Sequence, residues 1–138
     1  MTRCTRSLEL TNQLSEIGKL TDLLEQLAEA WGLSEDVLFK ANLALDEIVS
    51  NIIRHGYPDS EDHRITVRLG LEKGHLLMEI EDNAPEFNPL DAPEPDTSAP
   101  LEERTIGGLG IFLTRKLMDH MAYRRSGGKN ILSLSKKL

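Results

Sequence analysis

The stretch Leu45–Tyr57, LDEIVSNIIRHGY, decides the fold because it combines a helical apolar pattern with two polar side chains. Residues four apart lie one above the other on a helix, so we expect Glu47 and Asn51 to point into the same space. The apolar residues of this helix are expected to be buried: Val37, Leu38, Ala41, Leu45, Ile48, Val49, Ile52 and Ile53. A carboxylate can accept a proton, and an amide oxygen can ligate a hard cation. The pair therefore predicts a small polar site of the kind that a magnesium nucleotide requires.

The composition indicates one acidic domain of 138 residues, which is long enough to bury a core. Its 23 acidic residues against 16 basic ones argue against a protein that binds duplex nucleic acid, which would carry a basic face. The single cysteine, Cys4, excludes an intramolecular disulfide and suits a reducing cytosol. Neither a signal-peptide pattern nor an apolar run of membrane-spanning length is present. We therefore expect a single cytoplasmic domain over residues 1–138, with neither a nucleic-acid nor a membrane partner.

The rest of the chain alternates between strand-like and helical patterns. The patterns predict a strand at 7–11, a helix at 12–31, a helix from 35 to about 56, strands at 65–71 and 76–82, a helix at 111–121, and strands at 122–125 and 130–135. Gly32 suits the end of the first helix, and Ser34 suits the N-cap of the second. Adjacent hairpins with the helices collected elsewhere favour an α+β domain with two layers over an alternating parallel α/β sheet.

The segment from Asn88 to Ile106 follows neither period. Five of the six prolines fall between Pro85 and Pro100, interleaved with acidic residues. A loop of this length is uncommon inside a compact domain and is often a functional lid. A solvated insertion that the fold tolerates is the alternative.

A glycine cluster, Gly107-Gly108-Leu109-Gly110, precedes the third helix. Backbone N–H groups of Gly108, Leu109 and Gly110 could face a phosphate, with the helix dipole adding partial positive charge. Glycines also end loops for purely steric reasons, so this cluster alone is weak evidence. The chain lacks a P-loop and the loop motifs of eukaryote-type protein kinases, so nucleotide chemistry would require a different fold.

Asp82 is placed at the end of a predicted strand and is followed by Asn83-Ala84-Pro85-Glu86-Phe87. An ionised carboxylate only accepts hydrogen bonds, so Asp82 could read the exocyclic amine of adenine, or it could simply cap its own turn. Simple alternatives also exist for the helical residues. Glu47 could be a solvated carboxylate, Asn51 a core or surface amide, and His55 a cap for the helix end before Gly56. Four scattered histidines and one cysteine lack the spacing of a zinc site.

Taken in order, these motifs resemble the N, G1 and G2 boxes of the GHKL ATPase superfamily, which includes gyrase, Hsp90, histidine kinases and MutL-type proteins. The motifs are Glu47-x-x-x-Asn51, Asp82-x-Ala84-x-x-Phe87 and Gly108-x-Gly110. The chain is most similar to the small single-domain branch, the bacterial anti-sigma-factor serine/threonine kinases, from about Leu8 to Leu134. The resemblance implies a Bergerat fold, a two-layer α/β sandwich. Its sheet would be mixed and mostly antiparallel, with helices on one face and an ATP lid at about residues 88–106.

The resemblance also implies ATP and Mg²⁺ as cofactors and a role for each motif. Asn51 would ligate Mg²⁺, Glu47 would orient or deprotonate the nucleophile, and Asp82 would read adenine. The other nucleotide-binding positions that it implies are His55, Ala84, Phe87, Arg104, Gly107, Gly108, Leu109 and Gly110; Arg104 is placed where small members have an arginine that contacts the γ-phosphate. Ala84 departs from the family, which usually has glycine there. Its methyl group could crowd the base or remodel the turn.

The implied function is that of an ATP-loaded protein that binds a sigma factor or related regulator. It would phosphorylate a serine or threonine on a STAS-type antagonist protein. The main alternative is a non-catalytic binding module, in which nucleotide only sets the shape of a partner-binding face. A stand-alone ATPase is less favoured, because 138 residues leave no room for a transducer domain. Self-association as a homodimer is left open.

Overall fold

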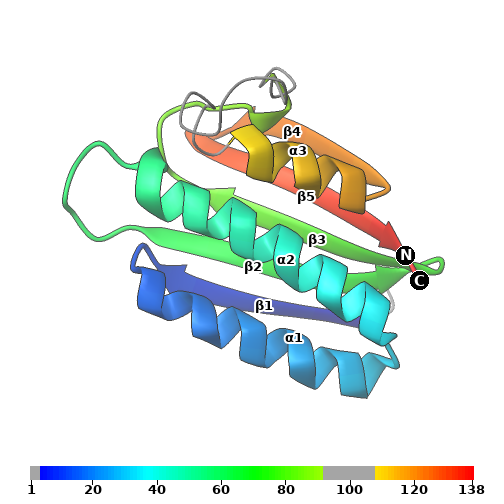
Figure 1. Ribbon diagram of the computed structural model, residues 1–138. Coiled ribbons are helices and arrows are strands. Elements are labelled where there is room, and N and C mark those ends of the chain that lie inside the picture. The colour runs from blue at the N-terminus through cyan, green and yellow to red at the C-terminus, as the bar shows by residue number, and fades with distance from the viewer. Residues whose placement is uncertain (1–3, 92–107) are drawn as a thin grey trace.

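In the computed structural model, which describes residues 4–91 and 108–138, five strands form one open sheet (Figure 1). The strands are β1 (Cys4–Thr11), β2 (Arg64–Glu72), β3 (His75–Asp82), β4 (His120–Ser126) and β5 (Lys129–Lys137). Their order in the sheet is β1-β2-β3-β5-β4. The two central neighbours, β3 and β5, bring Asp82 opposite Asn130.

Three helices lie on one face of this sheet: α1 (Ile17–Trp31), α2 (Glu35–Asn51) and α3 (Gly108–Leu117) (Figure 1). Their apolar sides meet the inward-facing residues of the strands in one core. Its members include Leu24, Leu45, Val49, Val67, Met78, Ile80 and Leu132. On β3, buried residues alternate strictly with partly exposed ones, as expected for a sheet with one solvated face. The predicted two-layer α+β sandwich is confirmed.

The sheet differs in one respect from the mixed sheet that the resemblance implies. Each pairing between the described strands is antiparallel. The crossover through α3 does make β4 run in the same direction as β3. The chain then turns back through a hairpin, and β5 lies between these two strands, so that they are not neighbours.

The ends of the first two helices follow the expected capping chemistry. Gly32 has a left-handed backbone with φ of 68°, and its N–H donates to the Ala28 carbonyl. The Ser34 hydroxyl accepts a hydrogen bond from the Val37 N–H at 3.1 Å. Beyond Asn51, the expected α-helix continues instead as a π-helical turn, η2 (Ile52–Gly56). π-Helical turns are rare in proteins, and those that do occur are often found at functional sites.

The third helix is shorter than its apolar pattern predicts. It ends at Leu117, whereas the pattern extends to Met121, which lies in β4. The Asp119 N–H donates to the Ser135 carbonyl at 2.9 Å, so the backbone at this position bonds to β5 and no longer continues the helix. Two short 3₁₀ turns, η1 (Leu14–Glu16) and η3 (Pro89–Asp91), complete the described elements. Residues 92–106 of the expected lid lie outside the described part of the chain.

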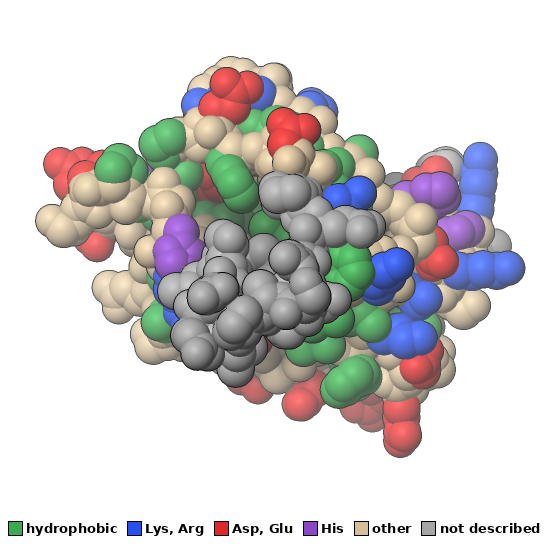
Figure 2. Space-filling view, turned by 45° about the horizontal axis from the view of Figure 1, so that its top comes forward, with side chains coloured by type: hydrophobic (Ala, Val, Ile, Leu, Met, Phe, Trp, Pro, Cys, Tyr) green, Lys and Arg blue, Asp and Glu red, His purple; other side chains and the backbone are tan. Residues whose placement is uncertain are grey.

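Charge is distributed unevenly between the elements. Residues 17–51, which form α1 and α2, contain seven acidic and two basic residues. Residues 108–138, which form α3, β4 and β5, contain seven basic residues and one acidic residue. Most of the Lys and Arg side chains in the view of Figure 2 lie on its right-hand side. None of the described helices has the length and apolar character that crossing a membrane requires.

Candidate functional site

Glu47 and Asn51 lie together on α2, as their spacing predicts. The Asn51 side-chain nitrogen, Nδ2, donates to Glu47 Oε1 at 3.3 Å. Both side chains are half-buried, while Leu45, Ile48 and Val49 beside them are buried. The amide uses its nitrogen for this contact, so its oxygen is directed elsewhere and is suited to a cation.

The glycine-rich start of α3 lies against the Glu47 side chain of this pair. A Cβ atom built on Gly110 would lie 2.7 Å from Glu47 Cγ and would overlap the Glu47 carboxyl group. Only glycine at position 110 allows α3 to lie this close to α2 while the Glu47 carboxyl group keeps its present position. In the next turn of α3, the buried Thr114 hydroxyl donates to the Gly110 carbonyl at 3.0 Å. The first turn of α3 and the Glu47/Asn51 pair thus form one continuous feature.

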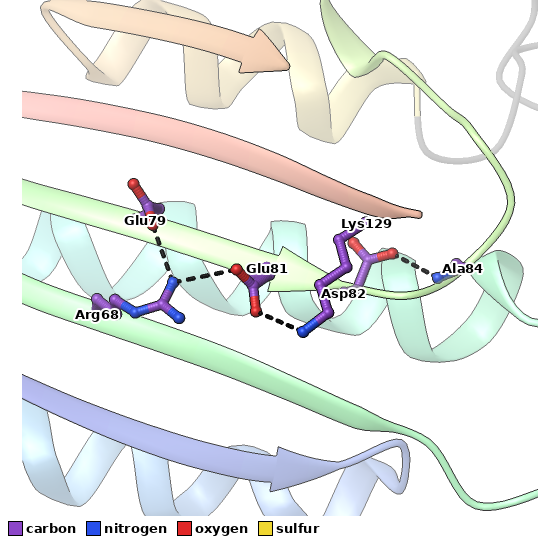
Figure 3. Close-up of polar contacts among 6 residues, drawn as sticks. All are labelled: Arg68, Glu79, Glu81, Asp82, Ala84 and Lys129. Carbon is purple, nitrogen blue, oxygen red and sulfur yellow. Dashed lines mark hydrogen bonds and ion pairs between the residues drawn. The ribbon is translucent and has the colours of Figure 1, made fainter. Parts of the chain in front are cut away.

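Asp82 lies at the end of β3 and is 5% exposed. Its Oδ1 atom accepts a hydrogen bond from the Ala84 N–H at 2.9 Å (Figure 3) and another from the Asn130 side chain at 2.9 Å. The first bond is the turn cap that a simple aspartate in a loop would make. The second joins the turn to the neighbouring strand β5.

The loop after Asp82 rests against the π-helical turn that follows α2. A Cβ atom built on Gly56 would lie 3.4 Å from the Cβ atom of Ala84. Ala84 is buried, so its methyl group packs on the bare backbone of Gly56. Helix α2 and its extension therefore contact Gly110 at Glu47 and the Asp82 loop at Gly56. Nine residues separate these two points, or about 13 Å along a helix.

Acidic residues at the end of β3 have different partners on the two faces of the sheet. On the solvated face, Arg68 donates to Glu79 at 2.9 Å, and Lys129 lies 3.2 Å from Glu81 (Figure 3). Asp82 follows Glu81 and points to the opposite face, where its hydrogen bonds come from neutral amide groups. The surface carboxylates Glu79 and Glu81 thus pair with basic side chains, whereas Asp82 forms no salt bridge among the described residues.

Tyr57 lies next to this loop and forms its aromatic neighbour. Its ring stacks on His63 with a centroid distance of 4.1 Å and an interplanar angle of 8°. Burial, together with the charge of Asp82, raises the pKa of the Tyr57 hydroxyl to about 12. The hydroxyl is therefore neutral at physiological pH.

Several of the remaining expected site residues lie outside the buried part of the site or outside the described residues. His55 is exposed, and Phe87 is 60% exposed, so neither side chain is enclosed in the site. Gly108 and Leu109 lie in the first turn of α3. Arg104 and Gly107 lie outside the described residues, and their assignments stay predictions. Among the residues that are described, no group of three or more His, Cys, Asp or Glu side chains is placed to hold a metal ion.

Asn130, which is 6% exposed and lies on β5, was not among the predicted site residues. It occupies a core-facing strand position two residues before the buried Leu132. An amide at such a position is the signal that could have revealed it, because a buried polar group must find partners. The partners themselves depend on the pairing of β5 with β3, which the local pattern does not specify.

Comparisons with known proteins identify the family of the chain. Residues 10–136 match the model of the histidine kinase-like ATPase domain. The chain is 27% identical over 135 residues to the serine/threonine-protein kinase BtrW of Bordetella bronchiseptica, covering 98% of this chain and 95% of that protein. It is 27% identical over 121 residues to the serine-protein kinase RsbW of Oceanobacillus iheyensis, covering 84% of this chain and 75% of that protein.

A solved structure supports the fold. The crystal structure of the RsbU and RsbW domains of a Mycobacterium tuberculosis protein superposes with a TM-score of 0.70 at 14% sequence identity. The match covers 98% of this chain and 32% of the solved chain, which is longer. At this identity the likeness establishes the arrangement of helices and strands.

Proposed function

The chain belongs to the histidine kinase-like ATPase domain family, and from this we propose that it is an ATP-dependent serine/threonine protein kinase of the anti-sigma-factor type. The observation that carries the proposal is that α2 and its π-helical extension contact both of the other motifs. Glu47, which is hydrogen-bonded to Asn51, lies beside Gly110, and Gly56 contacts the Asp82 loop. Relatives that match most of this chain are named serine- or serine/threonine-protein kinases, which supports the same activity.

At the phosphate end, the residues present fit a magnesium triphosphate. The Asn51 amide nitrogen is held by Glu47, so the amide oxygen is the atom that would ligate Mg²⁺. When bound, Mg²⁺ would neutralise charge on the phosphate oxygens. The backbone N–H groups at the start of α3 would hold the phosphates, assisted by Arg104.

At the base end, Asp82 would accept a hydrogen bond from the exocyclic amine of adenine. Both hydrogen bonds that it accepts from Ala84 and Asn130 end on Oδ1, so Oδ2 is the atom suited to this contact. The departure from the usual glycine at Ala84 is accommodated, because the methyl group packs on Gly56. Alanine at this position is therefore compatible with a nucleotide site.

The reaction that we propose transfers the γ-phosphoryl group to a serine or threonine hydroxyl. Glu47 would accept the proton of the substrate hydroxyl while the hydroxyl oxygen bonds to the γ-phosphorus. The bond from that phosphorus to the oxygen of the leaving ADP would break. Gly110 holds the start of α3 against the Glu47 carboxyl group, which limits where that group can move. The acceptor that we propose is a STAS-type antagonist, and the regulated partner is a sigma factor, in the cytoplasm.

Radiolabelled ATP and a candidate antagonist test this mechanism. Wild type should label the antagonist, and Glu47→Gln should reduce the rate by about 10²–10⁴-fold while still binding ATP. Asp46→Asn, which changes the exposed carboxylate beside Glu47, is the matched control and should keep the wild-type rate. Undiminished transfer by Glu47→Gln would rule out the role of Glu47. Complex formation that depends on ATP but gives no transfer would establish the non-catalytic switch instead.

A further inference from the structure

Asn130 is the most connected polar side chain of the described residues and lies at the edge of the proposed adenine site. Its Nδ2 atom donates to Asp82 Oδ1 at 2.9 Å and lies 3.2 Å from the Ala84 carbonyl and 3.1 Å from the Pro85 carbonyl. Because an amide nitrogen carries two hydrogens, at least one of them is shared between two acceptors. A single donor group thus reaches both the carboxylate and the backbone of the same loop.

The oxygen of the same amide is also fully used. Asn130 Oδ1 accepts from the Phe87 N–H at 3.3 Å, the Tyr123 hydroxyl at 2.6 Å and Arg125 Nη1 at 3.1 Å. Asn130 is therefore bonded to four of the six residues in the loop 82–87. Residues 83–87 of this loop lie beyond the end of β3, so they have no strand pairing to fix their backbone.

Arg125 on β4 holds the loop from a second side. Its Nη1 atom donates to the Ala84 carbonyl at 2.8 Å as well as to Asn130 Oδ1. Ala84 is thus fixed at its carbonyl by Asn130 and Arg125, at its N–H by Asp82, and at its methyl group by Gly56. The position where the family usually has glycine is held by contacts from four elements, β3, β4, β5 and η2.

We propose that Asn130, together with Arg125, is a positioning residue that sets the geometry of the adenine-reading loop. Through this loop it would control nucleotide affinity and the preference for adenine over guanine. The Asn130 bond fixes which way the Asp82 carboxylate points, and an ionised carboxylate accepts from the amine of adenine but repels the carbonyl oxygen that guanine has at the same place. This inference rests on the proposed function, because it assigns these residues to the base end of the same site.

Nucleotide binding provides the first test, using calorimetry with ATP and with GTP. Asn130→Ala and Arg125→Met should each weaken ATP binding by about tenfold or more and should bring the affinities for ATP and GTP closer together. Arg125→Lys, which keeps a donor, should retain more of the affinity than Arg125→Met. In the kinase assay, the KM for ATP should rise while kcat stays near its wild-type value.

A matched control separates positioning from a general loss of stability. Ile131→Ala removes a buried side chain from the next position of β5, which faces the other side of the sheet. It should lower the melting temperature without changing the ratio of ATP to GTP affinity. If Asn130→Ala and Arg125→Met keep the wild-type affinity and base preference, the proposal is wrong.

Amide hydrogen exchange on the nucleotide-free protein tests the loop independently of ATP. Asn130→Ala should speed exchange at the Phe87 and Ala84 amides while leaving the Val67 amide in β2 protected. Should wild type bind no adenine nucleotide, the proposed function fails, whereas slow exchange at Phe87 that depends on Asn130 would still establish the loop geometry. Unchanged exchange at both loop amides in Asn130→Ala would overturn the positioning role itself.

Discussion

Gly110 determines how closely the start of α3 can approach the Glu47 carboxyl group. Gly110→Ala would place a methyl group where that carboxyl lies, so the carboxyl or the helix must move. A displacement of about 1 Å at a reacting group can cost about 100-fold in rate, and we expect a loss of this order in phosphoryl transfer. The measurement is the initial rate of antagonist labelling by Gly110→Ala at saturating ATP.

Gly18→Ala is the control for this substitution, because, apart from the nearby backbone of α1 itself, no atom of the described residues lies within 4 Å of a Cβ atom built on Gly18. Alanine is a better helix former than glycine, so this variant should be more stable by about 0.5–1 kcal/mol and should keep the wild-type rate. A Gly110→Ala enzyme with full activity would show that the close approach of α3 to Glu47 has no catalytic importance.

At the level of single residues, the sequence predicted contacts within one helix and missed contacts between strands. The Glu47/Asn51 contact follows from a spacing of four residues, and the structure confirms their proximity. Asn130 lies 48 positions beyond Asp82, and only the pairing of β3 with β5 brings the two together. No local period encodes such a contact, so physical reasoning on one sequence could not find it.

Asp119 fixes the junction between α3 and β4 to the end of β5. Its Oδ2 atom accepts the Lys137 N–H at 2.6 Å and lies 3.6 Å from Lys136 Nζ. The hydrogen bond from Lys137, followed by the charge of Lys136, lowers the pKa of the Asp119 carboxyl below its ordinary value of 3.8. A carboxyl group with a depressed pKa adds stability above its unfolded pKa, and this stability is lost as the pH falls through the folded pKa.

Asp119→Asn therefore gives a signed prediction for pH dependence. The variant keeps an acceptor oxygen but lacks the charge, so it should melt below wild type near neutral pH. The difference should shrink as the pH falls below 3.8 and should vanish once wild-type Asp119 is protonated. Thermal unfolding of both proteins from pH about 7 to about 2 provides the measurement. A difference that stays constant over this range would mean that the Asp119 charge contributes nothing.

At the level of elements, the patterns identified each described α-helix and strand but placed several ends wrongly. The Ser34 and Gly32 caps were predicted correctly, because capping chemistry is local. The end of α3 at Leu117 was not predicted correctly, because the backbone bonds to β5 before the apolar helical pattern ends. The π-helical turn at Ile52–Gly56 was also missed, because its residues continue the apolar pattern of α2.

For the whole molecule, the net charge of −7 conceals an acidic part and a basic part. The acidic residues of α1 and α2 outnumber the basic ones by seven to two, and in the segment from α3 to β5 the basic residues outnumber the acidic ones by seven to one. The overall composition therefore did not indicate the charge of the local surfaces, and the single domain over residues 1–138 stays a prediction. The absence of a nucleic-acid partner stays a prediction, because composition is its only support.

The response of the whole fold to nucleotide gives the last prediction. A ligand that binds only the native state stabilises it by about 2.7 kcal/mol at a concentration of 100 Kd, which corresponds to a rise on the order of 10 °C in the melting temperature. Mg·ATP should produce such a rise in wild type and little or none in Asn51→Ala.

Asn42→Ala is the matched control, because Asn42 lies on the same helix but accepts a hydrogen bond from Thr21 at 3.4 Å. Its melting temperature should rise with Mg·ATP as in wild type, whereas an equal rise in Asn51→Ala would show that this amide does not hold the metal–phosphate group.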